Sequence, residues 1–175
     1  KLRIASATKV PISGLPISTF HALALRIVRS IGGAIDVPSD FEIWTKDFER
    51  VKIIRQLQKP VQQAGLYKDV EKEDKSAKAA LDYIDNVREE LLDPEDASIR
   101  EAELHNKANI AHCEVYAAYE EYLNKEKKID FPRMVQLACK ALAKNVETGG
   151  SYAENCKHIL IDEFQDINLA QKTLV

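Results

Sequence analysis

The chain has 175 residues, about the size of one domain, and a formal net charge of −3 at pH 7. Hydrophobic residues make up 45% of it, with only 6 Gly and 6 Pro, which favours a helix-rich globular protein and excludes global disorder. The charge argues against a nucleic-acid binder that is basic all over, but not against a local basic strip.

Cys113, Cys139 and Cys156 lack the spacing of a zinc site or a disulfide framework. This cysteine pattern leads us to expect a reducing compartment. No run of about 18 apolar residues is present, so we expect no membrane span.

Residues 15–31 predict a short strand that leads into a helix. The first part is compatible with a strand, and an apolar stripe through Leu23, Ile27 and Ile31 then recurs at helical spacing. In residues 32–40 two glycines supply a helix stop, and a Pro-Ser-Asp sequence reopens the chain as a loop. We therefore expect a boundary in this segment.

Residues 46–63 predict an amphipathic helix. Its apolar positions recur every three residues: Phe48, Val51, Ile54 and Leu57. Basic residues between them predict a basic outer face: Lys46, Arg50, Lys52, Arg55 and Lys59. The interleaved Asp47 and Glu49 are equally compatible with an ordinary solvated helix. The charge-rich segment 67–75 that follows predicts a loop.

Three further helices are predicted before residue 150. The first starts near Ser76 and is ended by Asp93-Pro94, since proline breaks a helix. The second has the cleanest periodicity in the chain, with an apolar stripe over residues 104–122, and is expected to pack in a helical bundle. Asp130 is suited to cap the third, which a Thr-Gly-Gly sequence closes.

The second of these helices carries side chains that also have functional interpretations. His105 and His112 lie seven residues apart, but no carboxylate or Cys partners stand at a metal-ligand spacing, so we interpret them as surface histidines. Tyr116, Tyr119 and Tyr122 are able to stack on bases, yet helix packing explains them more simply.

Near the end of the chain the period changes. Residues 158–161 form an unbroken apolar run between polar residues, the pattern of a short strand buried on both faces in a parallel sheet. The predicted fold class is mainly α, with two short strands of the parallel type at the ends and about five helices between them. Because two short strands alone are not stable, we expect them to belong to a larger sheet.

Asp162 and Glu163 directly follow this apolar run. A buried strand would hold Asp162 at the carboxyl edge of a sheet, where open α/β sheets bind ligands. There Asp162 can hold Mg²⁺, directly or through water, and the metal can bridge the β- and γ-phosphates of a nucleotide. Glu163 is suited to orient and deprotonate an attacking water. An Asp-Glu pair alone, however, is explained about equally well as a solvated cap between a strand and a helix.

The longer string over residues 159–166, Ile-Leu-Ile-Asp-Glu-Phe-Gln-Asp, closely resembles motif II of UvrD/Rep-type superfamily 1 DNA helicases. The resemblance implies that Asp162 and Glu163 are catalytic, with Asp162 on the Mg²⁺ of the nucleotide. It also implies that Gln165 senses the γ-phosphate and helps to couple hydrolysis to movement. Asp166 matches the motif too, with a less definite role.

A second match lies at the other end of the chain, where Thr19-Phe20-His21 resembles motif Ib of the same family. The resemblance implies that these residues contact the backbone of single-stranded DNA. A hydroxyl and an imidazole at a helix amino terminus can indeed donate to phosphate beside free backbone N–H groups. Residues 167–171 also resemble the family's continuation after motif II.

Two shorter matches delimit the middle of the chain. Residues 40–43, Asp-Phe-Glu-Ile, resemble the opening of the family's helical insert, and Ile129-Asp130-Phe131 resembles its close. The resemblance implies that the insert covers residues 32–125. The flanking residues 1–31 and 126–175 are then parts of the first RecA-like motor domain, an α/β domain of the P-loop NTPase class. In relatives the insert lies near duplex DNA, so the predicted basic helix face is a candidate duplex contact.

For the function, the resemblance implies an ATP-dependent DNA helicase that moves 3′ to 5′ on single-stranded DNA and unwinds duplexes. It implies ATP and Mg²⁺ as ligands, repair or replication proteins as partners, and an intracellular location: cytoplasmic in a bacterium, nuclear or organellar in a eukaryote. A helicase–nuclease subunit shares motif II. The alternative from another class is a helical protein-interaction module on an inactive motor core.

No GxxxxGKS or GxxxxGKT phosphate loop is present, and the chain starts with Lys1 and stops at Val175 inside a helix-like pattern. We therefore expect an excised segment that binds no ATP or Mg²⁺ and hydrolyses no ATP by itself.

Overall fold

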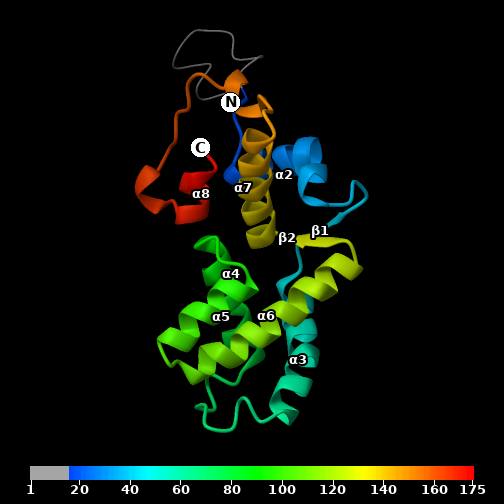
Figure 1. Ribbon diagram of the computed structural model, residues 1–175, viewed down its shortest axis with the longest axis vertical. Coiled ribbons are helices and arrows are strands. Elements are labelled where there is room, and N and C mark those ends of the chain that lie inside the picture. The colour runs from blue at the N-terminus through cyan, green and yellow to red at the C-terminus, as the bar shows by residue number, and fades with distance from the viewer. Residues whose placement is uncertain (1–15) are drawn as a thin grey trace.

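The computed structural model describes residues 16–175, which form two helical bodies stacked along the long axis of the molecule (Figure 1). The elements follow one another in this order: α2 (Phe20–Ile31), η1 (Gly32–Ile35), β1 (Glu42–Trp44), α3 (Asp47–Gln63), α4 (Ala77–Glu89), α5 (Pro94–Glu103), α6 (Lys107–Lys125), β2 (Lys128–Asp130), α7 (Phe131–Glu147), η2 (Tyr152–Asn155), η3 (Phe164–Asp166) and α8 (Leu169–Thr173). The prediction of a mainly helical fold is confirmed. Among these described elements, no helix is long and apolar enough to cross a membrane.

The first body is a bundle of α3, α4, α5 and α6. Its core contains Ile54 from α3, Ile84 from α4, Ala97 from α5, and Val115 and Tyr119 from α6, all without measurable exposure to solvent. The second body has a separate core, in which α2 packs on α7 and α8 packs on the same helix. Each body therefore has an apolar interior of its own.

Local sequence signals begin the helices on which the two bodies depend. Thr19 caps α2 by accepting a hydrogen bond from the backbone N–H of Ala22 at 3.2 Å. Asp130 caps α7 as predicted, since its Oδ1 accepts from the N–H of Arg133 at 3.1 Å. Each cap satisfies one of the backbone donors that a helix amino terminus leaves free.

The two described strands do not lie where the sequence predicts them. β1 and β2 pair in parallel with Ile43 opposite Ile129, and they lie between the two bodies (Figure 1). Residues 16–19 and 158–161 form no strand, so the prediction of strands at the ends is wrong within the described residues. A strand needs a neighbour to satisfy its backbone groups, and among the described residues β1 and β2 bond only to each other. Residues 158–160 of the apolar run are consequently exposed, completely so at Leu160, and Ile161 is partly buried.

The apolar stripe predicted for α3 is also partly wrong. Phe48 is 71% exposed, whereas Arg50 lies in the interior with Ile54 and Gln58. The reason is geometric, because positions three residues apart drift around a helix by about 60° at each step and cannot all share one face. The spacing of four that joins Arg50, Ile54 and Gln58 stays closer to one face. Arg50 therefore does not belong to the basic outer face.

Pro94 begins a helix that the sequence analysis does not predict. Asp93 caps α5 by accepting from the N–H of Asp96 at 3.2 Å, and Pro94 takes the first helical position. Proline is tolerated there because the N–H it lacks would have no partner inside the helix. Leu104, assigned to the following stripe, ends α5 and is exposed, and α6 begins only at Lys107.

Candidate nucleotide and DNA site

The acidic residues of the 159–166 string form one exposed turn. The backbone N–H of Glu163 donates to Oδ1 of Asp162 at 3.1 Å, and Nε2 of Gln165 donates to Oε2 of Glu163 at 2.6 Å. Asp166 closes the turn through its N–H, which donates to the carbonyl of Glu163 at 2.9 Å. The turn thus places three carboxylates and one amide on a short stretch of chain that is open to solvent.

Glu163 has a left-handed backbone conformation, with φ 53° and ψ 44°. For a residue with a side chain this conformation costs about 1–2 kcal/mol relative to the right-handed one. Such conformations cluster at functional sites, where the surroundings hold them in place. Here the Asp162 carboxylate and the η3 turn hold the Glu163 backbone from both sides.

α8 attaches this turn to the second body. Asn168 and Gln171 form a reciprocal capping box, in which Oδ1 of Asn168 accepts from the N–H of Gln171 at 2.9 Å. Ala170 and Leu174 are buried in the core beneath, and Sγ of Cys139 donates to the carbonyl of Ala170 at 3.3 Å. The Asn and Gln that resemble the family's continuation therefore have a structural role, the start of α8.

The Thr19-Phe20-His21 triplet lies at the amino terminus of α2. The Thr19 hydroxyl accepts from Ala22 and keeps its own O–H to donate. The imidazole of His21 lies edge-on to the ring of Phe131, with the centroids 5.1 Å apart. Nη2 of Arg26, an exposed side chain two turns along α2, donates to the hydroxyl of Ser18 at 3.2 Å. Arg26 lies outside the family motif, but its spacing of seven residues from Thr19 places both on one helix face.

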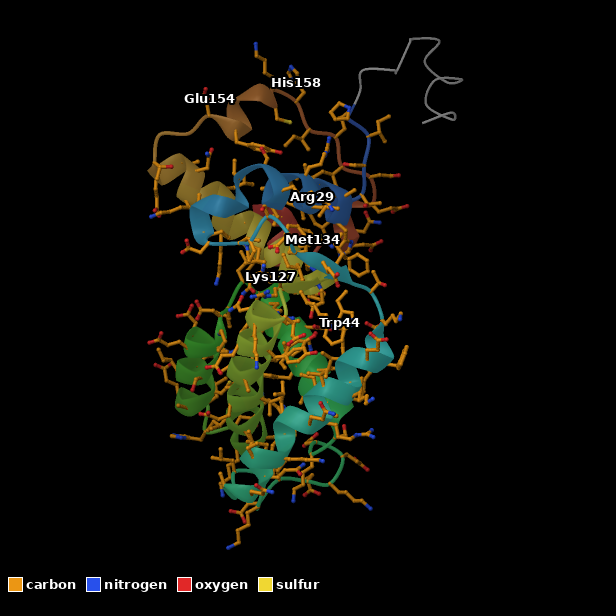
Figure 2. The ribbon with its side chains drawn as sticks, turned by 90° about the vertical axis from the view of Figure 1, so that its right-hand side faces the viewer. Arg29, Trp44, Lys127, Met134, Glu154 and His158 are labelled. Atoms are coloured by element: carbon orange, nitrogen blue, oxygen red, sulfur yellow. The ribbon has the colours of Figure 1, made fainter. Side chains whose placement is uncertain are left out.

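The acidic turn and the triplet are connected through α7. α2, which follows the triplet, and α8, which follows the turn, both pack on this helix. Figure 2 shows Met134 of α7 in the interior of this body, with Glu154 and His158 at the end of the molecule away from the bundle. Both candidate sites thus belong to one body and share one supporting helix.

The donor set fits a metal held mainly by a nucleotide. Among the described residues, no group of three or more His, Cys, Asp or Glu side chains converges into a metal cage. Mg²⁺ needs no such cage, since it keeps several waters and uses one or two carboxylates together with substrate phosphates. Asp162, an exposed carboxylate at the start of the turn, suits that arrangement.

Comparison with known proteins gives the chain its family. The family described as "UvrD/REP helicase N-terminal domain" matches residues 1–175. The chain belongs to this family. It is 30% identical over 159 residues to ATP-dependent DNA helicase PcrA of Leuconostoc citreum, covering 91% of the chain and 20% of that protein. It is 30% identical to ATP-dependent DNA helicase UvrD1 of Mycobacterium bovis, over 91% of the chain and 20% of that protein. It is 29% identical to ATP-dependent DNA helicase Rep of Salmonella typhimurium, over 93% of the chain and 22% of that protein. The chain thus spans about a fifth of the length of these relatives.

The bundle of this UvrD/REP chain presents a positive stripe on α3. Lys52, Arg55 and Lys59 follow the exposed Phe48 at intervals of four, three and four residues, and all are exposed. Two neighbouring carboxylates are engaged elsewhere: that of Asp47 by Arg50, and that of Glu49 by Lys46 and the Trp44 indole. Three positive charges and an aromatic ring therefore share one exposed helix face.

The remaining aromatic and histidine candidates belong to the packing of the bundle. Tyr116 and Tyr119 are completely buried and Tyr122 is half-buried, which confirms packing as their role. The prediction of two surface histidines on one helix is wrong. His105 is exposed but lies in the turn between α5 and α6, and His112 is buried between Tyr67 and Tyr83.

Proposed function

We propose that this chain supplies, within a longer ATP-dependent DNA helicase, the catalytic carboxylates and one contact to single-stranded DNA. The observation that carries the proposal is the acidic turn, in which Gln165 is bonded to Glu163 and Asp162 lies beside it, open to solvent. Membership of the UvrD/REP family supports the same proposal. The relatives are named ATP-dependent DNA helicases, and this activity is proposed here for the full-length protein.

Each residue of the turn has a distinct proposed role. Asp162 would hold Mg²⁺ together with a nucleotide, and the metal supplies neutralisation of the charge that develops on the β- and γ-phosphates. Glu163 orients the attacking water and accepts its proton. Gln165 senses the γ-phosphate, and its 2.6 Å hydrogen bond to Glu163 makes the proposed sensor a direct neighbour of the proposed base. Asp166 shapes the turn through its backbone bond to Glu163.

Two surfaces are proposed to contact DNA. The Thr19 hydroxyl, Phe20 and the His21 imidazole lie at the amino terminus of α2, where free N–H groups and the helix dipole favour phosphate. Arg26 adds a positive charge beside Ser18. The α3 stripe faces duplex DNA, and its three cations lie one helical turn apart.

In the proposed layout the second body is the part of a RecA-like motor domain formed by residues 1–31 and 126–175, and residues 32–125 form the helical insert. Movement from 3′ to 5′ and action with repair or replication proteins are the family's properties, which we propose for the full-length protein. The separate cores of the two bodies support a division of this kind.

The test is ATP hydrolysis by the full-length protein with and without single-stranded DNA, in wild type and Glu163→Gln. The variant keeps the shape of the side chain and removes the base, so a DNA-stimulated rate should fall by about two orders of magnitude or more. Glu154→Gln, an exposed carboxylate on η2 outside the turn, is the matched control and should keep the wild-type rate. Equal and negligible rates in all three proteins would favour the interaction-module function instead.

A further inference from the structure

The junction between the two bodies is built around one guanidinium. Arg88 of α4 has no exposed surface, and it lies over the rings of Tyr116 and Tyr119, each 5.2 Å from its charged carbon. Its Nη1 donates to both oxygens of Asp130, at 3.1 and 3.0 Å, and its Nη2 donates to Glu120 at 2.5 Å. A charge from the bundle is therefore bonded to the residue that begins α7.

The Asp130 carboxylate also accepts hydrogen bonds and an ion pair from residues of both bodies. The Tyr119 hydroxyl donates to its Oδ2 at 2.8 Å, and Nη2 of Arg50 lies 3.2 Å from the same oxygen. The N–H of Arg133 in α7 donates to Oδ1. One buried carboxylate thus joins α3, α4 and α6 of the bundle to the start of α7.

Glu120 makes a second bridge of the same kind. Its Oε1 accepts from Arg88 of the bundle and its Oε2 from Nε of Arg133 at 2.7 Å. Nη1 and Nη2 of Arg133 donate to the Lys128 carbonyl at 3.0 Å and to Asn124 at 2.5 Å. Fork-shaped guanidinium contacts of this type fix orientation as well as distance.

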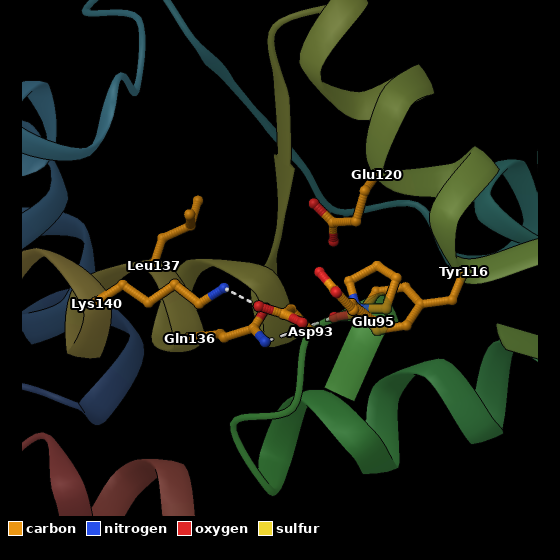
Figure 3. A pocket seen from close by; sticks show the side chains of 8 residues that line it. Asp93, Glu95, Tyr116, Glu120, Gln136, Leu137 and Lys140 are labelled. Atoms are coloured by element: carbon orange, nitrogen blue, oxygen red, sulfur yellow. Dashed lines mark hydrogen bonds and ion pairs between the residues drawn. The ribbon is translucent and has the colours of Figure 1, made fainter. Parts of the chain in front are cut away.

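Apolar packing leaves part of the junction open. A cavity of about 340 Å³ lies there, between residues of the α4–α5 connection and α5, α6 and α7 (Figure 3). Gln136 of α7 crosses it to donate to the Leu92 carbonyl at 2.8 Å, and Lys140 lies 3.5 Å from Asp93. The two apolar cores are separate, and the bodies are joined by Leu91, which packs on the second core, by the packing of α4 on α7 and α8, by the short β1–β2 pair and by these polar contacts. Among these contacts the guanidinium–carboxylate bonds are directional, so they can fix the angle between the bodies.

We infer that Arg88 and Asp130 are positioning residues that fix the angle between the α3–α6 bundle and the α2–α7 body, and so hold the α3 stripe in register with the α2 amino terminus. The expected effect on unwinding rests on the proposed function, whereas the role of Arg88 and Asp130 in fixing the angle does not. Contact with single-stranded DNA alone uses only the α2 side. Separation of a duplex requires both surfaces at once, so it is the step that depends on the angle.

Two variants of the full-length protein test the inference. Asp130→Asn keeps the shape and, through its one amide oxygen, the α7 cap, but it removes the charge and replaces Oδ2, which accepts from Tyr119, with an NH2 donor. Arg88→Lys keeps the charge and removes the fork of two nitrogens. Arg100→Lys is the matched control, since Arg100 bonds Glu90 and Glu101 inside the bundle and does not cross the junction.

The first readout is the distance between spin labels at the exposed positions Gln56 of α3 and Ala143 of α7. Cys156 and any exposed cysteine outside this chain are replaced beforehand, while Cys113 and Cys139 are buried and stay. Wild type and Arg100→Lys should give one narrow distance distribution, and both junction variants a broadened or shifted one. An unchanged distribution in Asp130→Asn and Arg88→Lys overturns the inference.

The second readout is duplex unwinding per ATP hydrolysed. The junction variants should keep the hydrolysis rate stimulated by single-stranded DNA and lose about tenfold or more in unwinding per ATP, because small misplacements of a contact surface are costly. A broadened distance distribution with unchanged unwinding per ATP would refute the functional part. Absence of DNA-stimulated hydrolysis in the wild type would instead refute the proposed function, and the distance measurement would then decide the inference alone.

Discussion

Arg88 and Asp130 lie 42 residues apart in the sequence, and a single guanidinium nitrogen of Arg88 donates to both carboxylate oxygens of Asp130. Burial alone would raise the pKa of Asp130, but the positive charges of Arg88 and Arg50 outweigh it and hold that pKa below its ordinary value. The carboxylate therefore stays ionised in the interior, and its stabilisation depends on the arginines around it.

Removal of the guanidinium should be strongly destabilising. Arg88→Met leaves the buried carboxylate of Asp130 with fewer partners, so the free energy of unfolding of the chain should fall by about 3–5 kcal/mol. Urea unfolding followed by the fluorescence of Trp44, the only tryptophan in the chain, measures this loss. Arg55→Met, an exposed arginine on α3, is the control and should change stability by no more than about 0.5 kcal/mol. Equal stabilities of the two variants would contradict the ion-pair interpretation.

The sequence predicts the helix cap that Asp130 forms at this junction, but not the arginines that bind the same carboxylate. Asp130 is recognisable as a cap because its role depends on the three residues that follow it. Its arginine partners come from α3 and α4, and helical periodicity carries no information on such distant pairs. The periodicity therefore predicts Arg50 on the outer face of its helix, whereas its ion pairs with Asp85 and Asp130 hold it inside.

The acidic turn gives a similar contrast. The motif predicts that Asp162, Glu163 and Gln165 act together, and the hydrogen bonds within the turn are local. The strand expected before them is absent because strand formation depends on a neighbouring strand, which a local apolar pattern does not reveal. The two short sequences that delimit the insert do pair, as β1 and β2, and their resemblance to family sequences gave no sign of that contact.

His112 should make the stability of the bundle sensitive to mild acid. Its Nε2 must donate to the Asp74 carbonyl at 2.9 Å, which leaves Nδ1 buried without a partner in the described part of the chain. Burial lowers the pKa of His112, and the Asp74 carbonyl and the charge of Glu101 oppose this only in part. The unfolded chain therefore takes up the proton first, so stability should fall as the pH drops below about 6.5 toward the lowered pKa of the folded state.

The measurement is the urea midpoint between pH 7.5 and pH 5.5. His112→Gln keeps a donor for Asp74 and cannot titrate, so its midpoint should depend less on pH than that of the wild type. His105→Gln changes an exposed histidine in the turn after α5 and should keep the wild-type dependence. A dependence that survives in His112→Gln would assign the effect to another group.

Replacement of the α3 cations should change how binding of duplex DNA depends on salt. If Lys52, Arg55 and Lys59 each neutralise one phosphate, the slope of log affinity against log salt should become less negative by about 2.7 in the triple alanine variant of the full-length protein. A matched triple variant replaces three exposed lysines outside α3, namely Lys68, Lys72 and Lys107. Equal slopes in the two triple variants would remove the α3 stripe from the duplex contact.

Thr19 has two roles that substitution can separate. Its hydroxyl oxygen caps α2, so Thr19→Ala should destabilise the chain by about 1 kcal/mol, whereas Thr19→Ser keeps both the cap and the O–H donor. Thr19→Asn keeps an acceptor for the cap and replaces the small hydroxyl with a bulkier amide. If the hydroxyl also binds phosphate, affinity for single-stranded DNA should follow the order wild type and Ser above Asn, while stability is similar in all three. Equal affinities in the Ser and Asn variants would limit Thr19 to the cap and leave the phosphate contact to His21 and the backbone of α2.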